Sequence, residues 1–301
     1  MEKIFNLNSK IFQDIKGLKL SSVVFTILSP IIIMILGAIP INIIASLIFS
    51  FIKDIKIIET YLHQIILILS TGMSIIICFL IVKFKEKRKI GTMGFSFNKK
   101  SFIDYLEGFG LGIAMIGIVW VGIALFGNAT FEVKLDSIMR GSFLIPFILM
   151  TVAWIIQGAS EEIMLRGYML PVLGVKVGPK FGIIVSSLFF SALHLANSGV
   201  TVLSLINLAL FGFFAAFYAM KSESLWGICA LHSAWNFAQQ NIFGTLVSGG
   251  IVYNSSIINT TYIENNLING GNFGPEGGIL VTAVLVIGIT IQVIGFKKRN
   301  I

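Results

Sequence analysis

The sequence predicts an all-α protein that crosses a membrane about eight times. Three observations favour this class: 56% of the 301 residues are hydrophobic, only 12% are charged, and the hydrophobic residues gather in long runs between short charged segments. A soluble domain carries about a quarter charged residues, so this chain lacks the polar side chains to cover a water-exposed surface. The composition therefore excludes an ordinary soluble enzyme and a disordered chain.

Each predicted span is a run long enough to cross the hydrocarbon core, which takes about 20 mainly apolar residues. The first run contains Pro30 and Pro40, which predict a kinked or tilted helix. No cleavable signal peptide is expected, because the first 19 residues are polar and the apolar run that follows is too long. The eight runs are 20–52, 60–83, 102–126, 143–165, 181–198, 202–220, 224–247 and 278–296.

The lysines and arginines predict that both termini are cytoplasmic. Four lysines precede the first run and six basic residues lie between 85 and 100, whereas the long segment 248–277 has none. Basic residues concentrate in cytoplasmic loops, and an even number of spans returns the chain to its starting side. The net charge of +8 therefore indicates a lipid bilayer as partner rather than nucleic acid, and a multi-pass protein of the cell membrane.

Two further segments carry local predictions. Gly108 and Gly112 are four residues apart in the third run, which predicts a close helix–helix contact rather than a nucleotide-binding loop. The outer segment 248–277 is rich in Asn, Gly and Ser, and we expect it to be exposed and irregular.

Ionisable side chains inside the predicted spans are the main functional signal, since each costs about 2.5–3.5 kcal/mol at mid-helix. Glu161, Glu162 and Arg166 lie near the cytoplasmic end of the fourth run. Glu162 and Arg166 are one helical turn apart and can pair, which leaves Glu161 in need of another partner. A pair of charges reaching towards water at the interface is the alternative interpretation. Glu161 is at the depth of the other polar groups only if this helix continues past Arg166.

Two more polar patches follow on later runs. Phe190 and His194 share one face of the fifth run, and His232 and Asn236 share one face of the seventh. Each patch alone is explained as well by a polar helix–helix contact. Together with Glu161 they lie within about 75 residues, and polar groups in lipid face the bundle interior. We therefore expect the three patches to meet at one cavity.

Such a set supports hydrolysis by an activated water. Glu161 would be the general base, His194 would position the water or act as an acid, and His232 and Asn236 would donate hydrogen bonds to an oxyanion. Glu161, His194 and His232 could instead bind zinc with water in the open position. The sequence leaves both versions open. It contains no H-E-x-x-H motif and no pair of intramembrane aspartates.

The three patches resemble the CAAX protease and bacteriocin-processing family, also called Abi, which includes the type II CAAX prenyl endopeptidases. The family motifs E-E-x-x-x-R, F-x-x-x-H and H-x-x-x-N/D occur here in order, as Glu161, Glu162 and Arg166, then Phe190 and His194, then His232 and Asn236. The resemblance covers about residues 142–245. It implies an eight-helix intramembrane fold, a site open to cytoplasm and lipid, and peptide-bond hydrolysis with Glu161 as the base. Glu162 and Arg166 carry over as supporting groups, and a metal requirement stays open.

On this basis we expect three regions: 1–141, with an N-terminal cytoplasmic segment and three spans; 142–247, the catalytic core with four spans; and 248–301, an outer loop and the final span. The leading hypothesis is an intramembrane endopeptidase acting on a membrane-associated peptide or protein, in pheromone or bacteriocin maturation or in self-immunity. A non-catalytic immunity or regulatory protein on the same scaffold is the alternative. A proton-coupled transporter is a third hypothesis, disfavoured by the lack of repeated halves and broken helices.

Overall fold

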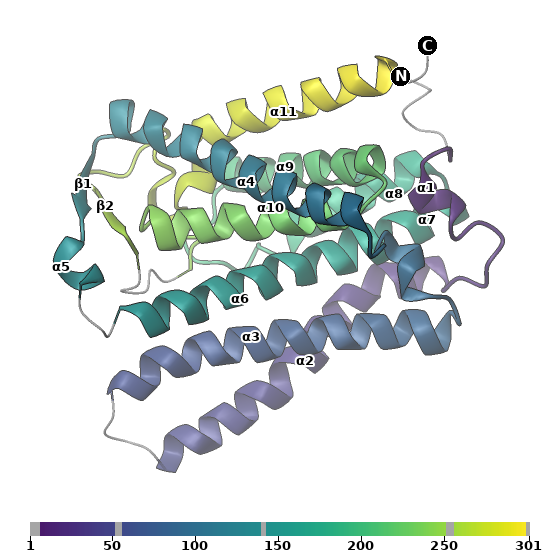
Figure 1. Cartoon of the computed structure of the whole chain (residues 1–301), viewed down its shortest axis with the longest axis horizontal. Helices are drawn as coiled ribbons and strands as arrows, with labels where there is room; N and C mark the ends of the chain where they lie inside the picture. Colours follow the sequence, from purple (N-terminus) through teal and green to yellow (C-terminus); the bar gives the residue numbers. More distant parts are fainter. Residues whose placement is uncertain (1–6, 52–55, 140–142, 251–255, 299–301) are drawn as a thin grey trace.

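The computed structural model describes residues 7–51, 56–139, 143–250 and 256–298, and this part of the chain is mainly helical (Figure 1). The all-α prediction is therefore confirmed, with one small antiparallel strand pair added. The elements are α1 Lys10–Gln13, α2 Val23–Phe51, α3 Lys56–Leu80, α4 Lys99–Phe126, β1 Ala129–Val133, α5 Leu135–Ile138, α6 Leu144–Glu162, α7 Leu170–Lys176, α8 Pro179–Ala192, α9 Val202–Ser222, α10 Trp226–Phe237, β2 Ile258–Tyr262 and α11 Ile279–Lys298.

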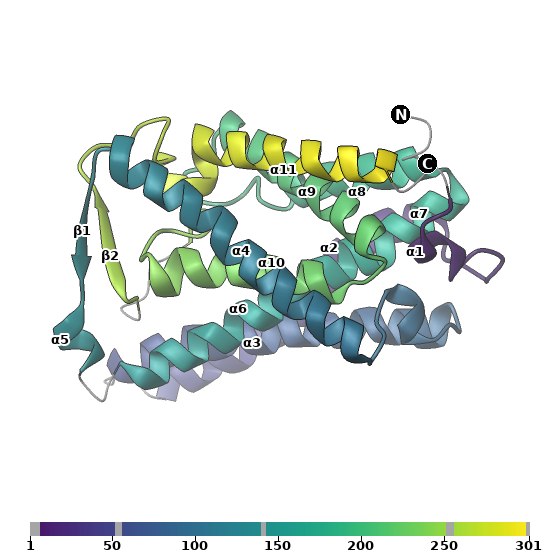
Figure 2. The same ribbon diagram turned by 45° about the horizontal axis from the view of Figure 1, so that its top comes forward.

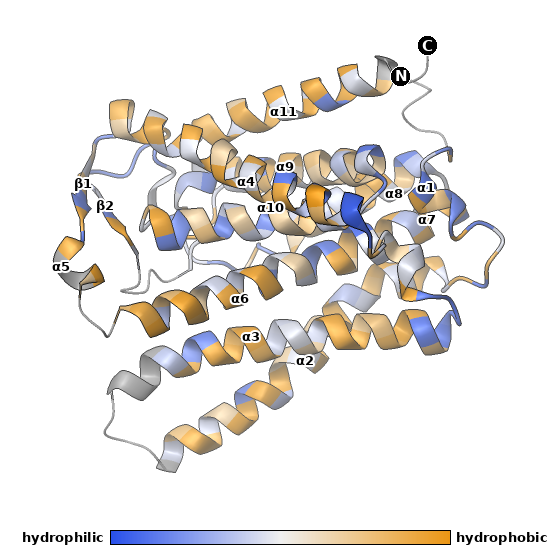
Figure 3. Cartoon of the chain, in the orientation of Figure 1, coloured by the Kyte–Doolittle hydropathy of each residue, from blue (hydrophilic) through white to orange (hydrophobic). Residues whose placement is uncertain are grey.

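Six helical segments of the described chain are long and apolar enough to cross a membrane. They belong to α2, α3, α4, the continuous run from α6 to α7, α9 and α11, and most of their ribbon is coloured as hydrophobic in Figure 3. Large apolar side chains such as Leu36, Leu125 and Ile287 are exposed on their outer faces. Because lipid is the favourable environment for such faces, the chain is an integral membrane protein.

Two of the eight predicted runs form shorter helices than expected. The run 181–198 becomes α8, which has 14 residues and ends at Ala192, and the run 224–247 becomes α10, which has 12. A π-helical turn, Ala238–Ile242, extends α10 before the chain turns away at Phe243 and Gly244. Helix α10 is almost wholly buried inside the bundle, where the lipid thickness does not set its length, whereas α8 has one buried face and one exposed face that includes Ile184 and Leu188. The count of eight full spans is thus unconfirmed.

The helix that carries the two adjacent glutamates continues beyond Arg166, as the sequence analysis required. After α6 the chain forms a π-helical segment, Ile163–Met169, and then α7, which gives one helical run from Leu144 to Lys176. All seven residues of the π-helical segment are buried. Glu161 and Glu162 therefore lie inside this run rather than at its end. A π-helical insertion rotates the following residues, and such insertions are frequent at functional sites.

Helix α4 crosses directly over α10, as Figures 1 and 2 both show. The contact depends on the two glycines singled out in the sequence: a Cβ at Gly108 would overlap the backbone of Gly227, and one at Gly112 would overlap the carbonyl of Leu231. Small residues allow two membrane helices to approach closely and pack backbone to backbone. The predicted close contact is confirmed, and it holds the helix that carries His232.

A substitution at Gly108 should therefore destabilise the bundle, whereas one at Gly110 should not. Gly108→Ala forces α4 and α10 apart and should cost about 1–3 kcal/mol in the free energy of unfolding. Gly110, on the same helix, has nothing within 4 Å of an added Cβ. Unfolding of Gly108→Ala and Gly110→Ala in mixed micelles checks this contrast, and equal stabilities would contradict the packing argument.

The segment 248–277 is more ordered than the sequence predicted. Within its described part, β2 pairs antiparallel with β1, and two 3₁₀ turns, Gly271–Phe273 and Pro275–Gly277, precede α11. Phe273 and Glu276 are buried, so the expectation of a wholly exposed segment was wrong. Gly270 and Gly274 have positive φ angles, and these glycines allow the tight turns that fold the chain back into the bundle.

Both ends of the described chain lie together. Helix α1 and the C-terminal end of α11 lie at one end of the molecule, and β1, β2 and α5 lie at the other (Figure 1). This arrangement agrees with an even number of passes through the bundle. Cytoplasmic placement of the termini stays a prediction from the basic residues.

Candidate active site

A cavity of about 370 Å³ lies inside the bundle, and residues from all three polar patches line it. Its wall includes Glu161 of α6, His194 after α8, and His232 and Asn236 of α10. The structure thus confirms that the patches share one cavity. Glu162 and Arg166 do not line it; they are fully buried behind the wall.

Glu161 is the carboxylate that faces the cavity. Its Oε1 atom accepts a hydrogen bond of 2.8 Å from Nε2 of Gln157, one helical turn earlier. Its Oε2 atom has no hydrogen-bond partner among the described residues and lies 3.6 Å from Nε2 of His232. A buried carboxylate oxygen without a partner is costly unless it binds a further donor, and a water molecule supplies one.

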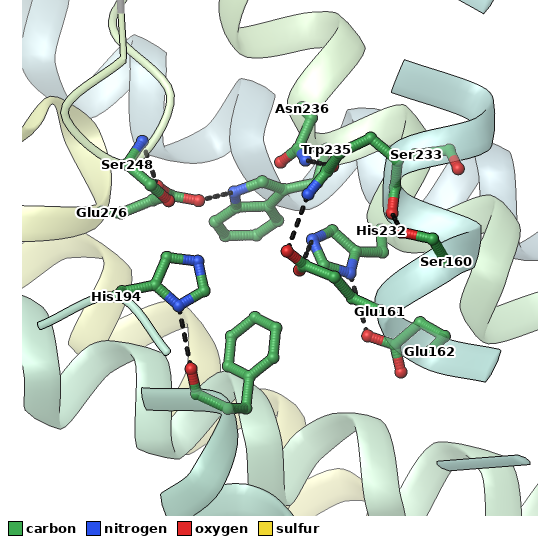
Figure 4. Close-up of polar contacts among 12 residues, drawn as sticks. Ser160, Glu161, Glu162, His194, His232, Ser233, Trp235, Asn236, Ser248 and Glu276 are labelled. Carbon is green, nitrogen blue, oxygen red and sulfur yellow. Dashed lines mark hydrogen bonds and ion pairs between the residues drawn. The ribbon is translucent and has the colours of Figure 1, made fainter. Parts of the chain in front are cut away.

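His232 is held between the two glutamates. Its Nδ1 atom donates to Oε1 of Glu162 over 2.9 Å, and its Nε2 atom points towards Glu161 (Figure 4). A carboxylate on one ring nitrogen fixes the orientation of an imidazole and leaves the other nitrogen for the site. Glu162 therefore orients His232 in addition to pairing with Arg166.

Arg166 holds Glu162 in place and links it to a neighbouring helix. Its Nη1 atom donates to Oε1 of Glu162 over 3.0 Å, and its Nη2 atom donates to the carbonyl oxygen of Gly212 in α9 over 3.1 Å. The guanidinium also stacks 5.0 Å from the centre of the Phe190 ring. The pairing of Glu162 with Arg166, expected from their spacing, is confirmed, and it ties α6 to α8 and α9.

His194 does not lie on a helix, contrary to the sequence prediction. Helix α8 ends at Ala192, and His194 lies in the series of turns that follows, with its Nδ1 atom 2.8 Å from the carbonyl oxygen of Phe190. That carbonyl accepts the Nδ1 proton, so Nε2 is left as an acceptor. In Figure 4 the ring lies across the open space from Glu161 and His232. The Phe190 ring fills the space beside both histidines, 5.0 Å from His194 and 5.7 Å from His232 between ring centres.

Asn236 lies one turn after His232, with part of its donor capacity already used. Its Nδ2 atom donates to Oε1 of Gln157 over 2.8 Å. An amide nitrogen has two hydrogens, so one is left to bind a substrate oxygen. Gln157 therefore links Asn236 to Glu161. Gln157 was not among the predicted site residues, although its position one turn before Glu161 on a predicted span was a usable signal.

The three proposed metal ligands do not form a compact donor set. Within the described residues, no three His, Cys, Asp or Glu side chains are arranged to hold a metal ion. Glu161 and His232 approach each other, but Nδ1 of His232 is engaged with Glu162 and His194 lies across the cavity. The donors present do not fit a zinc site, and zinc binding stays a prediction from the sequence.

The cavity wall also includes residues from the segment 248–277, which was predicted to be outside the membrane. Ser248, Gly249 and Gly250 line it, and so does Glu276 from the turn before α11. This segment carried no recognisable motif. The site is therefore assembled from more of the chain than the three motif-bearing segments.

Residues 143–238 match the family described as Type II CAAX prenyl endopeptidase Rce1-like. No curated protein matches the chain. The matched segment contains all six predicted site residues, from Glu161 to Asn236, together with Phe190 and Gln157, whereas Ser248 and Glu276 lie beyond its end.

Proposed function

We propose, from the match of residues 143–238 to the Type II CAAX prenyl endopeptidase Rce1-like family, that the chain hydrolyses a peptide bond within the cavity by means of a water molecule activated by Glu161. The observation that carries the proposal is that Glu161 lines the cavity with its Oε2 atom beside His232 and without a hydrogen-bond partner among the described residues. A carboxylate in that position can take a proton from water as the water attacks.

The attack requires a water held between a base and the substrate carbonyl. Oε2 of Glu161 accepts one hydrogen of the water, and Nε2 of His194, which is an acceptor when Nδ1 donates to Phe190, can accept the other. The water oxygen bonds to the carbonyl carbon while Glu161 takes its proton. Holding the water beside the carbonyl makes the attack effectively unimolecular, and this contributes much of the rate acceleration in such reactions.

The tetrahedral intermediate needs donors for its oxyanion. The free amide hydrogen of Asn236 is one donor, and Nε2–H of His232 is the other when the ring carries both protons. Each ring nitrogen of His232 faces a carboxylate, so both protons have acceptors in the resting site. The carbon–nitrogen bond then breaks, and the proton on Glu161 passes to the leaving amine.

The substrate we propose is a peptide or protein segment at a membrane. The cavity lies among helices whose outer faces are apolar, so a membrane-anchored chain reaches it without leaving the bilayer. The motif set suggests two biological settings, which are maturation of a secreted peptide and self-immunity of a bacterial cell. We place the protein in the cell membrane.

Reconstitution with defined peptides tests the proposal. The protein in liposomes is incubated in ¹⁸O-labelled water with lipid-anchored peptides of varied sequence, and the products are analysed by mass spectrometry. We expect cleavage with solvent oxygen in the new carboxyl terminus, and its loss in His194→Ala. Absence of cleavage from every anchored peptide, with the protein folded, would reject a protease in favour of a non-catalytic role.

A further inference from the structure

A second buried glutamate lies on the cavity wall, far along the chain from the motif residues. Glu276 is in the turn Pro275–Gly277 before α11, and 8% of its surface is exposed. Its Oε1 atom accepts a hydrogen bond of 3.0 Å from Nε1 of Trp235 in α10. Its Oε2 atom accepts two from Ser248, of 2.7 Å from the backbone nitrogen and 2.5 Å from the hydroxyl. Both oxygens of the carboxylate thus act as acceptors (Figure 4).

The backbone around Glu276 is held independently by α9. Nδ2 of Asn207 donates to the carbonyl oxygens of Glu276 and Gly278, over 2.8 and 2.9 Å. Oδ1 of the same Asn207 accepts from the hydroxyl of Thr282 in α11 over 2.6 Å. The turn therefore has a fixed position, and the carboxylate it presents can fix other groups.

From Ser248 the connection continues to the turn that carries His194. The carbonyl oxygen of Ser248 accepts a hydrogen bond of 2.8 Å from Nδ2 of Asn197, and the backbone nitrogen of Asn197 donates to the carbonyl oxygen of His194 over 3.0 Å. A Cβ at Gly249 would overlap the carbonyl of Ser198, so the two segments also pack backbone to backbone. A continuous bridge thus runs from Trp235 through Glu276, Ser248 and Asn197 to His194.

This bridge joins the two histidine-bearing segments. Trp235 stands between His232 and Asn236 in the sequence of α10, and its ring lies 5.8 Å from that of Phe211, which in turn lies 4.9 Å from His232. His194 lies two residues beyond the end of α8 and is bonded to that helix through its ring and its backbone nitrogen. The bridge adds a connection from the His194 turn across the cavity to α10, which carries His232.

We propose that Glu276 is a positioning residue of the active site, which fixes the His194 turn relative to α10 and so sets where the attacking water is held. The assignment rests on the proposed function. It extends the functional machinery beyond the family-matched segment, into the turn before the last helix. A carboxylate suits the role because three donors point at it. A glutamine amide in its place would turn its own NH₂ group, a donor, towards one of those donors.

Kinetics of Glu276→Gln test the role in catalysis. Losing a hydrogen bond to a charged acceptor corresponds to about a tenfold or greater effect, and we expect kcat to fall by that factor with little change in KM. Glu264→Gln is the matched control. Glu264 lies in the same segment 248–277 as Glu276 and also accepts a hydrogen bond, from Asn128, but it does not line the cavity. In an Asn197→Ala background, which already breaks the bridge, Glu276→Gln should have little further effect on kcat. Additive losses would overturn the proposal.

Hydrogen exchange tests the bridge without any substrate. In Glu276→Gln and Trp235→Phe, amides of residues 193–199 should exchange about tenfold faster, while those of α4 keep their wild-type rates. Unchanged exchange in the His194 turn, or faster exchange throughout the helices, would overturn a positioning role. If the wild-type protein cleaves no peptide, the proposed function fails, but this experiment still decides whether Glu276 fixes the turn.

Discussion

Replacing Glu161 with glutamine should abolish peptide cleavage while the protein still folds and inserts. Glutamine keeps the shape of the side chain and a partner for Gln157, but it cannot take a proton from water. General-base catalysis contributes about 10²–10⁴-fold, so we expect kcat to fall by at least two orders of magnitude. The measurement is initial cleavage rate in liposomes at saturating peptide.

The matched control for this prediction is Glu107→Gln. Glu107 is exposed on α4 and does not line the cavity, so the same chemical change there should leave the rate unaltered. Cleavage by Glu161→Gln at more than a tenth of the wild-type rate would show that another group activates the water.

Replacing Arg166 with leucine should produce the largest loss of stability of any single change considered. The ion pair with Glu162 has no exposed surface on either side chain, so removing the guanidinium leaves a buried carboxylate whose only other donor in the described part of the chain is His232. Breaking a buried pair from one side costs about 3–5 kcal/mol. Lost bonds to Gly212 and stacking on Phe190 add to the effect.

An exposed pair provides the comparison. Lys100 and Asp104 are 2.8 Å apart on α4, with the lysine side chain 66% exposed, and Lys100→Leu should cost no more than about 1 kcal/mol. Unfolding in mixed micelles measures both variants. Equal losses in the free energy of unfolding for Arg166→Leu and Lys100→Leu would show that burial does not decide how much an ion pair stabilises the fold.

Much of the site was predictable because its parts lie at helical spacing. The pairing of Glu162 with Arg166 follows from one helical turn, and the expected continuation of that helix is what the structure shows. The close contact at Gly108 and Gly112 also follows from spacing within one helix. The cost of polar groups in lipid was enough to predict that the three patches share a cavity.

The remaining features depend on contacts between distant segments, which no local pattern encodes. His194 was expected on a helix because F-x-x-x-H fits helical spacing, yet the bond from its ring to the Phe190 carbonyl forms in a turn after α8 has ended. Glu276 reached the cavity through glycine turns in a segment whose composition indicates exposed coil. Likewise, the short length of α10 reflects its buried position inside the bundle, which hydrophobicity alone does not distinguish from a full span.

The most direct test is the position of a bound substrate. A structure of Glu161→Gln with an uncleaved membrane-anchored peptide would locate the scissile carbonyl. We expect its carbon within about 4 Å of the side chains at position 161 and of His232, and its oxygen beside Asn236. A peptide bound instead in the apolar groove lined by Phe97, Tyr105 and Trp226, with the Glu161 cavity empty, would contradict the assignment of this cavity as the site of hydrolysis.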